Sequence, residues 1–225
     1  MYVSTVQVFY LNLSRVRKFS KILCKSLQCT SIQFVLCHCT NTCAPIFQQY
    51  GWYTHPIFSE EGDYPPVMRE RIDRISAQEG FTDTRLPRFT PEEVALLKGS
   101  SDFLGLNHYT TLLCAMGQDV DTPYPSLNKD IGVYCFHDDS WESAASVWLK
   151  VVPWGLRKLL VWIKEEYGNP EVIITENGFS DTGELNDCRR INYYNVSKLY
   201  QELSLCVIAN VNGESSIGWY TVRMT

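Results

Sequence analysis

The residue best suited to chemistry in this chain is Glu176, a carboxylate at the point where an apolar strand pattern stops. Residues 172–175 are of strand-forming types, and Asn177 and Gly178 follow the carboxylate in a turn. A parallel strand buried on both faces reads as a continuous apolar run, so a charged group at its end needs a reason. In barrels of alternating strands and helices, catalytic groups lie at the C-terminal ends of strands. The pattern therefore predicts a chemical role for Glu176.

Two further polar residues, Asn107 and Tyr109, follow a short apolar strand pattern over residues 103–106. They are separated by two positions, so both point to the same side of an extended strand, whereas His108 points to the opposite side and is assigned no role. From the residues alone, Asn107 and Tyr109 are either satisfied polar groups at a strand end or members of one site with Glu176.

The elements that must position these groups are marked by caps and periodicity. Residues 47–100 read as mostly loop with one or two short helices, one opening at Pro65-Pro66 and ending near Gly80. Thr90, Pro91 and Glu93 have the spacing of a capped helix start, and that helix stops at residue 99. Residues 111–150 read as a long connection without periodicity, typical of a loop over a binding face.

A longer helix is predicted over residues 153–167, directly before the strand that leads to Glu176. Its apolar stripe consists of Leu156, Leu159, Leu160, Ile163 and Tyr167, and residues 168–170 end it. After the turn that follows Glu176, Asp187 can cap another helix, in which Ile191, Tyr194 and Leu203 are expected to face inward.

Several blocks of sequence occur in a fixed order between residues 47 and 203. They are residues 51–58, 62–65, 85–93, 101–110, 152–156 and 174–178. Together these blocks resemble the family 1 glycoside hydrolases, the β-glucosidase and lactase-like group, and residues 174–178 match that family's Ile/Val-Thr-Glu-Asn-Gly nucleophile signature at every position. The resemblance implies a retaining β-glycosidase that hydrolyses O-glycosidic bonds in a β-glycoside small molecule or oligosaccharide.

The resemblance also implies roles for four residues. Glu176 would be the nucleophile, Tyr109 would hydrogen-bond and orient its carboxylate, Asn107 would line the same pocket, and Trp148 would form a wall of the leaving-group subsite. For Trp148, a buried packing role stays open as the alternative to the subsite wall. In this chemistry a second carboxyl group about 5–5.5 Å away protonates the departing oxygen and later activates water. No cofactor and no metal are implied.

Other motifs of the resembled family do not occur in the 225 residues. There is no Asn-Glu-Pro, which carries the acid/base carboxylate, no counterpart of the glycone-binding Gln and His, and no late Trp-rich block. The expected fold class is therefore α/β, an incomplete (β/α)8 TIM barrel covering about the sixth and seventh strand-helix units. We expect an unrelated, poorly ordered Cys-rich segment at 1–46, a partial barrel at 47–203 and a divergent tail at 204–225.

Five of the nine cysteines fall in the first 46 residues, namely Cys24, Cys29, Cys37, Cys39 and Cys43. A zinc or disulfide role is possible on composition, but the Cys-x-x-Cys spacing of structural zinc sites is absent and the total is odd, which favours unrelated sequence. No secretory signal is visible, because basic residues interrupt each apolar stretch, and a cytoplasmic location is favoured on that ground. The net charge of -5 gives no reason to expect nucleic acid, and no apolar run reaches the length of a membrane span.

Two hypotheses remain from the sequence. One is a β-glycosidase whose fragment carries the nucleophile. The other is a catalytically inactive splice or truncation product, acting at most as a carbohydrate-binding or partner-binding remnant. In either case, open barrel edges predict aggregation or pairing with another chain.

Overall fold

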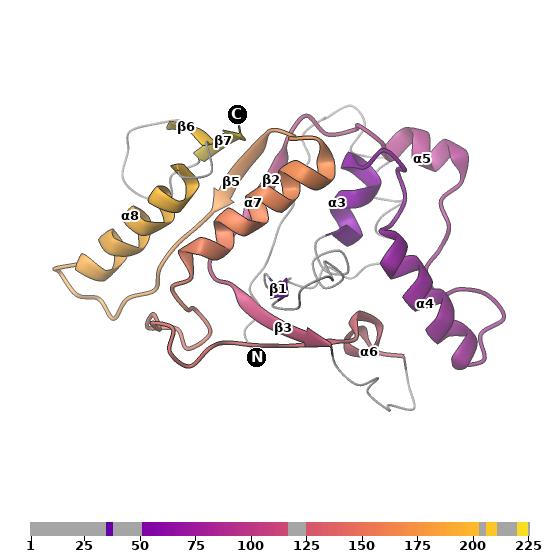
Figure 1. Ribbon diagram of the computed structural model, residues 1–225, viewed down its shortest axis with the longest axis horizontal. Coiled ribbons are helices and arrows are strands. Elements are labelled where there is room, and N and C mark those ends of the chain that lie inside the picture. The colour runs from indigo at the N-terminus through magenta and orange to yellow at the C-terminus, as the bar shows by residue number, and fades with distance from the viewer. Residues whose placement is uncertain (1–34, 38–50, 117–124, 203–205, 211–219, 225) are drawn as a thin grey trace.

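The computed structural model describes residues 35–37, 51–116, 125–202, 206–210 and 220–224, which form two small sheets and the helices around them (Figure 1). The helices are α3 (Gly51–Phe58), α4 (Pro66–Gln78), α5 (Pro91–Leu97), α6 (Leu127–Ile131), α7 (Pro153–Tyr167) and α8 (Cys188–Glu202). The strands are β1 (Val35–Cys37), β2 (Leu104–Asn107), β3 (Leu112–Met116), β4 (Val133–Phe136), β5 (Val172–Glu176), β6 (Cys206–Asn210) and β7 (Tyr220–Met224).

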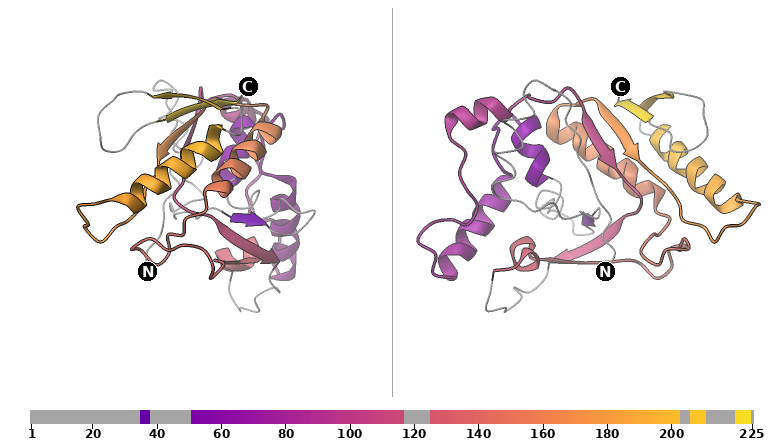
Figure 2. Two further views of the ribbon diagram at one scale, coloured as in Figure 1. Left: turned by 60° about the vertical axis from the view of Figure 1, so that its left-hand side comes forward. Right: turned by 180° about the vertical axis from the view of Figure 1, so that it is seen from behind.

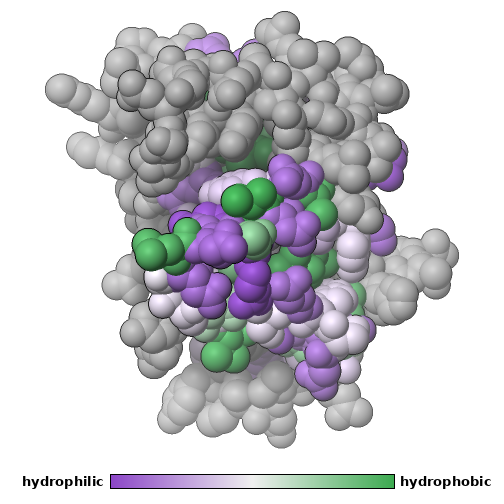
Figure 3. Space-filling view, turned by 90° about the vertical axis from the view of Figure 1, so that its left-hand side faces the viewer, coloured by the Kyte–Doolittle hydropathy of each residue, from purple (hydrophilic) through white to green (hydrophobic). Residues whose placement is uncertain are grey.

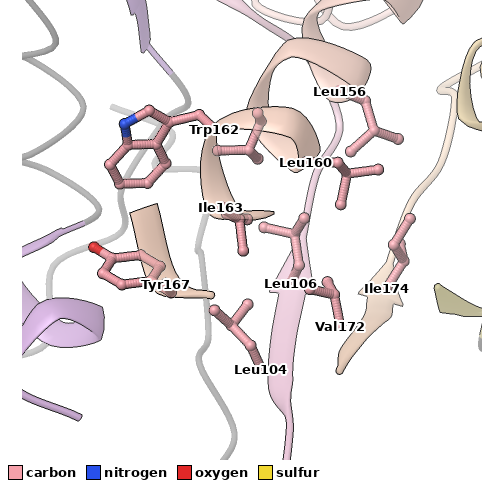
Figure 4. Packing of buried hydrophobic residues seen from close by; sticks show 10 residues of the cluster. Leu104, Leu106, Leu156, Leu160, Trp162, Ile163, Tyr167, Val172 and Ile174 are labelled. Carbon is pink, nitrogen blue, oxygen red and sulfur yellow. The ribbon is translucent and has the colours of Figure 1, made fainter. Parts of the chain in front are cut away.

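The centre of the fold is the parallel pair of β2 and β5, with α7 between them in the chain. The predicted stripe of α7 packs on these strands and forms the largest buried cluster (Figure 4). Its members are Leu104, Leu106, Leu156, Leu159, Leu160, Trp162, Ile163, Tyr167, Val172 and Ile174. Burial of a large apolar side chain contributes roughly 1.5–3 kcal/mol, so this cluster fixes how the ends of β2 and β5 lie side by side.

Helices cover only one face of the pair formed by β2 and β5. Seen from behind, these two strands lie in front of α7, and no helix among the described residues covers the face that they present (Figure 2). Parallel strands are normally buried on both faces, because helices or a closed barrel cover them. The arrangement is that of one segment of a barrel wall.

The tail predicted as divergent, residues 204–225, contributes β6 and β7 to this sheet. The strand order is β2-β5-β7-β6, and β7 runs antiparallel to β5 with Val222 opposite Val172. A barrel of alternating strands and helices would place a parallel strand at this edge of β5. The antiparallel partner pairs with residues 172–174 of β5 instead, so the predicted exposure of open edges does not apply to that part of the strand.

A second sheet has the order β1-β3-β4, with β1 parallel and β4 antiparallel to β3. The prediction of an unstructured connection over residues 111–150 was wrong in part, since β3, α6 and β4 all lie within it. Strand β3 has five residues and strand β4 has four, so both are too short to give a periodic signal in the sequence. β1 belongs to the Cys-rich segment 1–46, and the other residues of that segment lie outside the described ranges.

The three helices α3, α4 and α5 form the part of the fold that precedes β2 (Figure 1). The capping box predicted for α5 is present, with Thr90 accepting from the Glu93 backbone N–H and the Glu93 side chain accepting from Thr90. Helix α3 was not predicted, because Gly51 and the internal Pro56 disfavour a helix. Tertiary packing overrides that propensity, since Ile57 of α3 packs against Leu97 of α5.

Helix α8 follows Asp187 as predicted, but one of the residues expected to face inward is exposed. Tyr193 is buried at 3% exposure, whereas Ile191, expected to face inward, is 59% exposed. The inward face of α8 is thus set by its tyrosines. Leu203 lies outside the described residues. On this side of the molecule, hydrophilic side chains surround scattered hydrophobic ones (Figure 3).

A close approach between α7 and Thr111 depends on a glycine. A Cβ atom added at Gly155, in the first turn of α7, would lie 1.9 Å from Thr111 Oγ1 and 2.8 Å from Thr111 Cβ. No side chain contact in a protein is this short, so a larger residue would push the helix from the start of β3.

Gly155→Ala is therefore expected to lower the free energy of unfolding by about 1–3 kcal/mol, in spite of the higher helix propensity of alanine. Urea unfolding followed by circular dichroism measures the change. Glu165→Ala, at an exposed position of the same helix, is the matched control and is expected to stay within about 0.5 kcal/mol of the parent chain. Equal stability of the two variants would contradict the packing described here.

Among the described residues, no helix combines the length and the apolar content that crossing a bilayer requires.

Candidate active site

Glu176 and Tyr109 meet where β5 and β2 end. The Tyr109 hydroxyl donates a hydrogen bond to Glu176 Oε2 over 2.8 Å, and both side chains are partly exposed. The backbone continues the pairing beyond the strands, since the His108 N–H donates to the Glu176 carbonyl at 2.9 Å. The carboxylate is thus accessible from solvent, and its orientation is fixed by a neighbouring strand end.

A bulge brings the two strand ends into this register. Leu106 is paired with Ile174, but the next residue, Asn107, is paired with Glu176, so Thr175 has no opposite partner. Bulges re-aim side chains and are frequent next to active sites. Here the irregularity shifts Glu176 by one position along β2 and places it within reach of Tyr109.

Asn107 lies beneath the site and has only 1% of its surface exposed. Its Oδ1 accepts a hydrogen bond from the Thr175 hydroxyl, while its Nδ2 is buried without a hydrogen-bond partner among the described residues. Asn107 therefore supports the bulge, and one donor group on it is left for a further partner. Its expected part in substrate binding stays a prediction.

The phenol of Tyr109 is held in its protonated form. Burial raises the pKa of Tyr109, and the hydrogen bond to the Glu176 carboxylate raises that pKa further. A phenol with a raised pKa remains a hydrogen-bond donor at every ordinary pH, so the contact to the carboxylate persists.

Three residues hold the two strand ends together, and the sequence assigned none of them a role in the site, although Asn177 belongs to the matched signature and Tyr194 was expected to face inward. Asn177 donates from Nδ2 to the His108 carbonyl at 2.6 Å and to the Tyr193 hydroxyl at 3.0 Å, and Tyr193 in turn donates to the Tyr109 carbonyl at 2.9 Å. Tyr194 donates to the Asn177 carbonyl at 3.2 Å. For the two tyrosines, their adjacency on a helix after the strand was the signal in the sequence, and their reach across to β2 depends on the tertiary fold.

Trp148 stands beside Tyr109, with ring centroids 6.2 Å apart and an interplanar angle of 78°. The loop that carries it is hydrogen-bonded to the segments that follow β2 and β5. Thr110 donates to the Lys150 carbonyl at 2.8 Å, and the Ser146 N–H donates to the Ser180 hydroxyl at 2.8 Å. Trp148 is partly buried, so one part of the indole packs while another faces solvent on the side of Tyr109.

His108 lies on the other side of the strand, as its position predicted, and is buried at 4% exposure. Burial lowers the pKa of His108 to about 4, so its imidazole is neutral at neutral pH.

The arrangement offers an oriented carboxylate, a neutral phenol donor and an indole face in one place. Such a set can attack an electrophilic carbon next to a flat ring that stacks on the indole. Within the described ranges, no group of three or more His, Cys, Asp or Glu side chains could hold a metal ion.

Comparison with known proteins agrees with the resemblance. The family model described as glycosyl hydrolase family 1 matches residues 43–216. Myrosinase 1 of Brevicoryne brassicae is 44% identical over 144 residues, which cover 64% of this chain and 30% of that protein. Human cytosolic beta-glucosidase is 38% identical over 170 residues, which cover 74% of this chain and 35% of that protein.

Among solved structures, a rice beta-glucosidase mutant in a covalent complex with Glc is similar with a TM-score of 0.62 and 27% sequence identity. The similarity covers 92% of this chain and 48% of that one. The chain thus spans about a third of the two curated relatives described above. Its fold is an incomplete (β/α)8 barrel, as predicted, and β2, α7 and β5 are part of the barrel wall.

Proposed function

The chain belongs to glycosyl hydrolase family 1, and from that premise we propose that it carries the nucleophile half of a retaining β-glycosidase site of the β-glucosidase type. Glu176 is the nucleophile, Tyr109 orients its carboxylate, and Trp148 forms a wall for the leaving group. Asn107 supplies its remaining Nδ2 donor to the sugar side of the site.

The observation that carries this proposal is the 2.8 Å hydrogen bond from the Tyr109 hydroxyl to Glu176 Oε2. A nucleophilic carboxylate must present one oxygen to the anomeric carbon, and its rotamer must be held while it does so. The phenol occupies one oxygen of Glu176 and leaves the other for attack. The similar rice structure, in covalent complex with Glc, supports a covalent intermediate for this family.

In the proposed first step, a carboxylate oxygen of Glu176 forms a bond to C1 of the sugar while the bond from C1 to the leaving oxygen breaks. The electron pair of that bond stays on the leaving oxygen. A phenolate of low basicity leaves without protonation, whereas an alcohol or a sugar needs an acid to protonate it. The 225 residues contain no Asn-Glu-Pro motif, so we expect activated aryl glycosides to react and ordinary glycosides to need a second carboxyl group.

The test is a rapid-mixing assay with 2,4-dinitrophenyl β-glucoside. We expect a burst of dinitrophenolate up to one equivalent per chain, followed by slow turnover, because the Asn-Glu-Pro motif that would supply the general base for the second step does not occur in these residues. Sodium azide, an anion that needs no base, should speed the slow phase and yield a glucosyl azide with retained configuration. Absence of a burst, with or without azide, would overturn the proposed catalytic role.

A second candidate is a carbohydrate-binding chain without turnover. It is favoured by one observation, namely that the acid/base motif does not occur in these residues. Calorimetry with a β-glucoside distinguishes the two functions, because binding without a burst supports the second candidate and excludes the first.

Tyr109→Phe is expected to slow the burst about 10-fold to 100-fold, since a hydrogen bond to a charged group contributes about 1.5–3 kcal/mol and here holds the nucleophile in place. Stopped-flow absorbance of dinitrophenolate measures the rate constant. Tyr134→Phe removes a hydroxyl from an exposed position on β4 and serves as the matched control. If both variants retain the parental rate, Tyr109 has no orienting role.

A further inference from the structure

Two cysteines outside the candidate site lie opposite each other on the antiparallel strands β3 and β4. Cys114 and Cys135 are register partners, and the Cys135 thiol is hydrogen-bonded to the Cys114 thiol. Residues directly opposite in an antiparallel pair have Cβ atoms about 4.5–5.5 Å apart, and a disulfide needs about 3.5–4.5 Å. A small local adjustment therefore brings the two sulfur atoms to bonding distance.

The two thiols differ in a way that suits stepwise oxidation. Cys114 lies on the central strand of its sheet and is 1% exposed, whereas Cys135 lies on the edge strand β4 and is exposed. The hydrogen bond with Cys114 lowers the pKa of Cys135, which increases the share of thiolate at the accessible sulfur. Cys135 is thus the thiol that reacts first, and Cys114 is the one placed to react second.

We propose that Cys114 and Cys135 are a site of oxidative modification that forms an intramolecular disulfide on reaction with a low-molecular-weight disulfide such as oxidised glutathione. The Cys135 thiolate attacks one sulfur of oxidised glutathione, forms a mixed disulfide and releases one glutathione thiolate. The Cys114 sulfur then attacks Cys135 Sγ, loses its proton and expels the second glutathione. Both protein thiols are oxidised, and one glutathione disulfide is reduced to two thiols.

A third cysteine lies in the same row of the sheet and offers an alternative partner for Cys114, so the experiment can distinguish two pairings. Cys37 of β1 is the register partner of Cys114 on its other side. Cys135 is the partner that we infer, because its thiol is exposed on β4 and is hydrogen-bonded to Cys114. The inference does not depend on the proposed glycosidase activity, because neither cysteine belongs to the candidate site.

The experiment treats the reduced full-length chain with oxidised glutathione, blocks the remaining thiols by alkylation and maps the peptides by mass spectrometry without reduction. We expect one dominant cross-link, between the peptides of Cys114 and Cys135, with a mass lower by about 2 Da than the sum of the two reduced peptides. Cys188, an exposed cysteine outside this sheet, is the internal control and should carry a glutathione adduct.

Two variants separate the steps. In Cys114→Ser, Cys135 should keep its glutathione adduct, and in Cys135→Ser the buried Cys114 should remain reduced. The inference is overturned if the parent chain retains the glutathione adduct on Cys135, or if Cys114 is linked to Cys37 instead. The parent chain alone decides between these results, so the inference stays testable if a variant does not fold.

Discussion

Glu176→Gln is expected to abolish the burst of dinitrophenolate from 2,4-dinitrophenyl β-glucoside. The amide has nearly the same shape and can still accept the hydrogen bond from Tyr109, so the geometry of the strand ends is retained. It carries no negative charge and cannot form the glycosyl ester. Removal of a nucleophile of this kind costs on the order of a thousandfold or more in rate, and the measurement is the burst amplitude and rate by stopped flow.

Glu184→Gln is the matched control, because Glu184 is an exposed glutamate in the segment that follows β5. It should leave the burst unchanged. A burst that survives Glu176→Gln, or that is lost equally in both variants, would assign the reaction to another group or to a nonspecific effect on folding.

A second large effect is expected on stability as the pH falls. Burial lowers the pKa of His108 from 6.5 to about 4, so the unfolded chain binds a proton between these values that the folded chain does not. The stability present above pH 6.5 is lost as the pH falls toward 4, where the folded chain also becomes protonated. The difference between the two pKa values corresponds to roughly 3 kcal/mol in the free energy of unfolding.

Urea unfolding at a series of pH values measures this loss, and His108→Leu isolates it. In that variant, the free energy of unfolding should fall less steeply between pH 6.5 and about 4, because the unfolded chain takes up one proton fewer. His137→Gln is the control, since His137 is only partly buried, and it should retain most of the decline. Parallel curves for the parent chain and His108→Leu would show that His108 does not sense pH.

Much of the barrel segment could be predicted because its signals are local. The capping box at Thr90 and the stripe of α7 specify two helices without reference to the rest of the chain, and α7 ends at Gly168 in the left-handed conformation. Such signals were lacking for α3, with its internal proline, and for the short strands β3 and β4. These elements depend on packing partners that are distant in the sequence.

The C-terminal strands show the same limit. The tail does not follow the pattern of a barrel strand, and its pairing with β5 is antiparallel. An unpaired strand edge accepts any segment of suitable length that supplies backbone donors and acceptors, so neither partner nor direction could be inferred from side-chain patterns.

At the candidate site, the proximity of Glu176 and Tyr109 was implied by the family resemblance, whereas the residues alone placed both only at the C-terminal ends of strands. The bulge after Leu106 and the link from Asn177 to Tyr193 could not be predicted. A bulge has no reliable sequence signature. Tyr193 and Tyr194 are adjacent on α8 and both donate to backbone carbonyls near the strand ends, and the packing of that helix determines which carbonyl each of them reaches.

The most direct test of the account is covalent trapping of the parent chain. A 2-deoxy-2-fluoro-β-glucoside with a dinitrophenolate leaving group forms a long-lived ester with a retaining nucleophile, because fluorine slows both steps and the activated leaving group speeds only the first. Peptide mapping should locate a single fluoroglucosyl adduct on Glu176. A chain that remains unmodified under conditions that label a complete β-glucosidase, or that carries the adduct on a different residue, would contradict the proposed nucleophile.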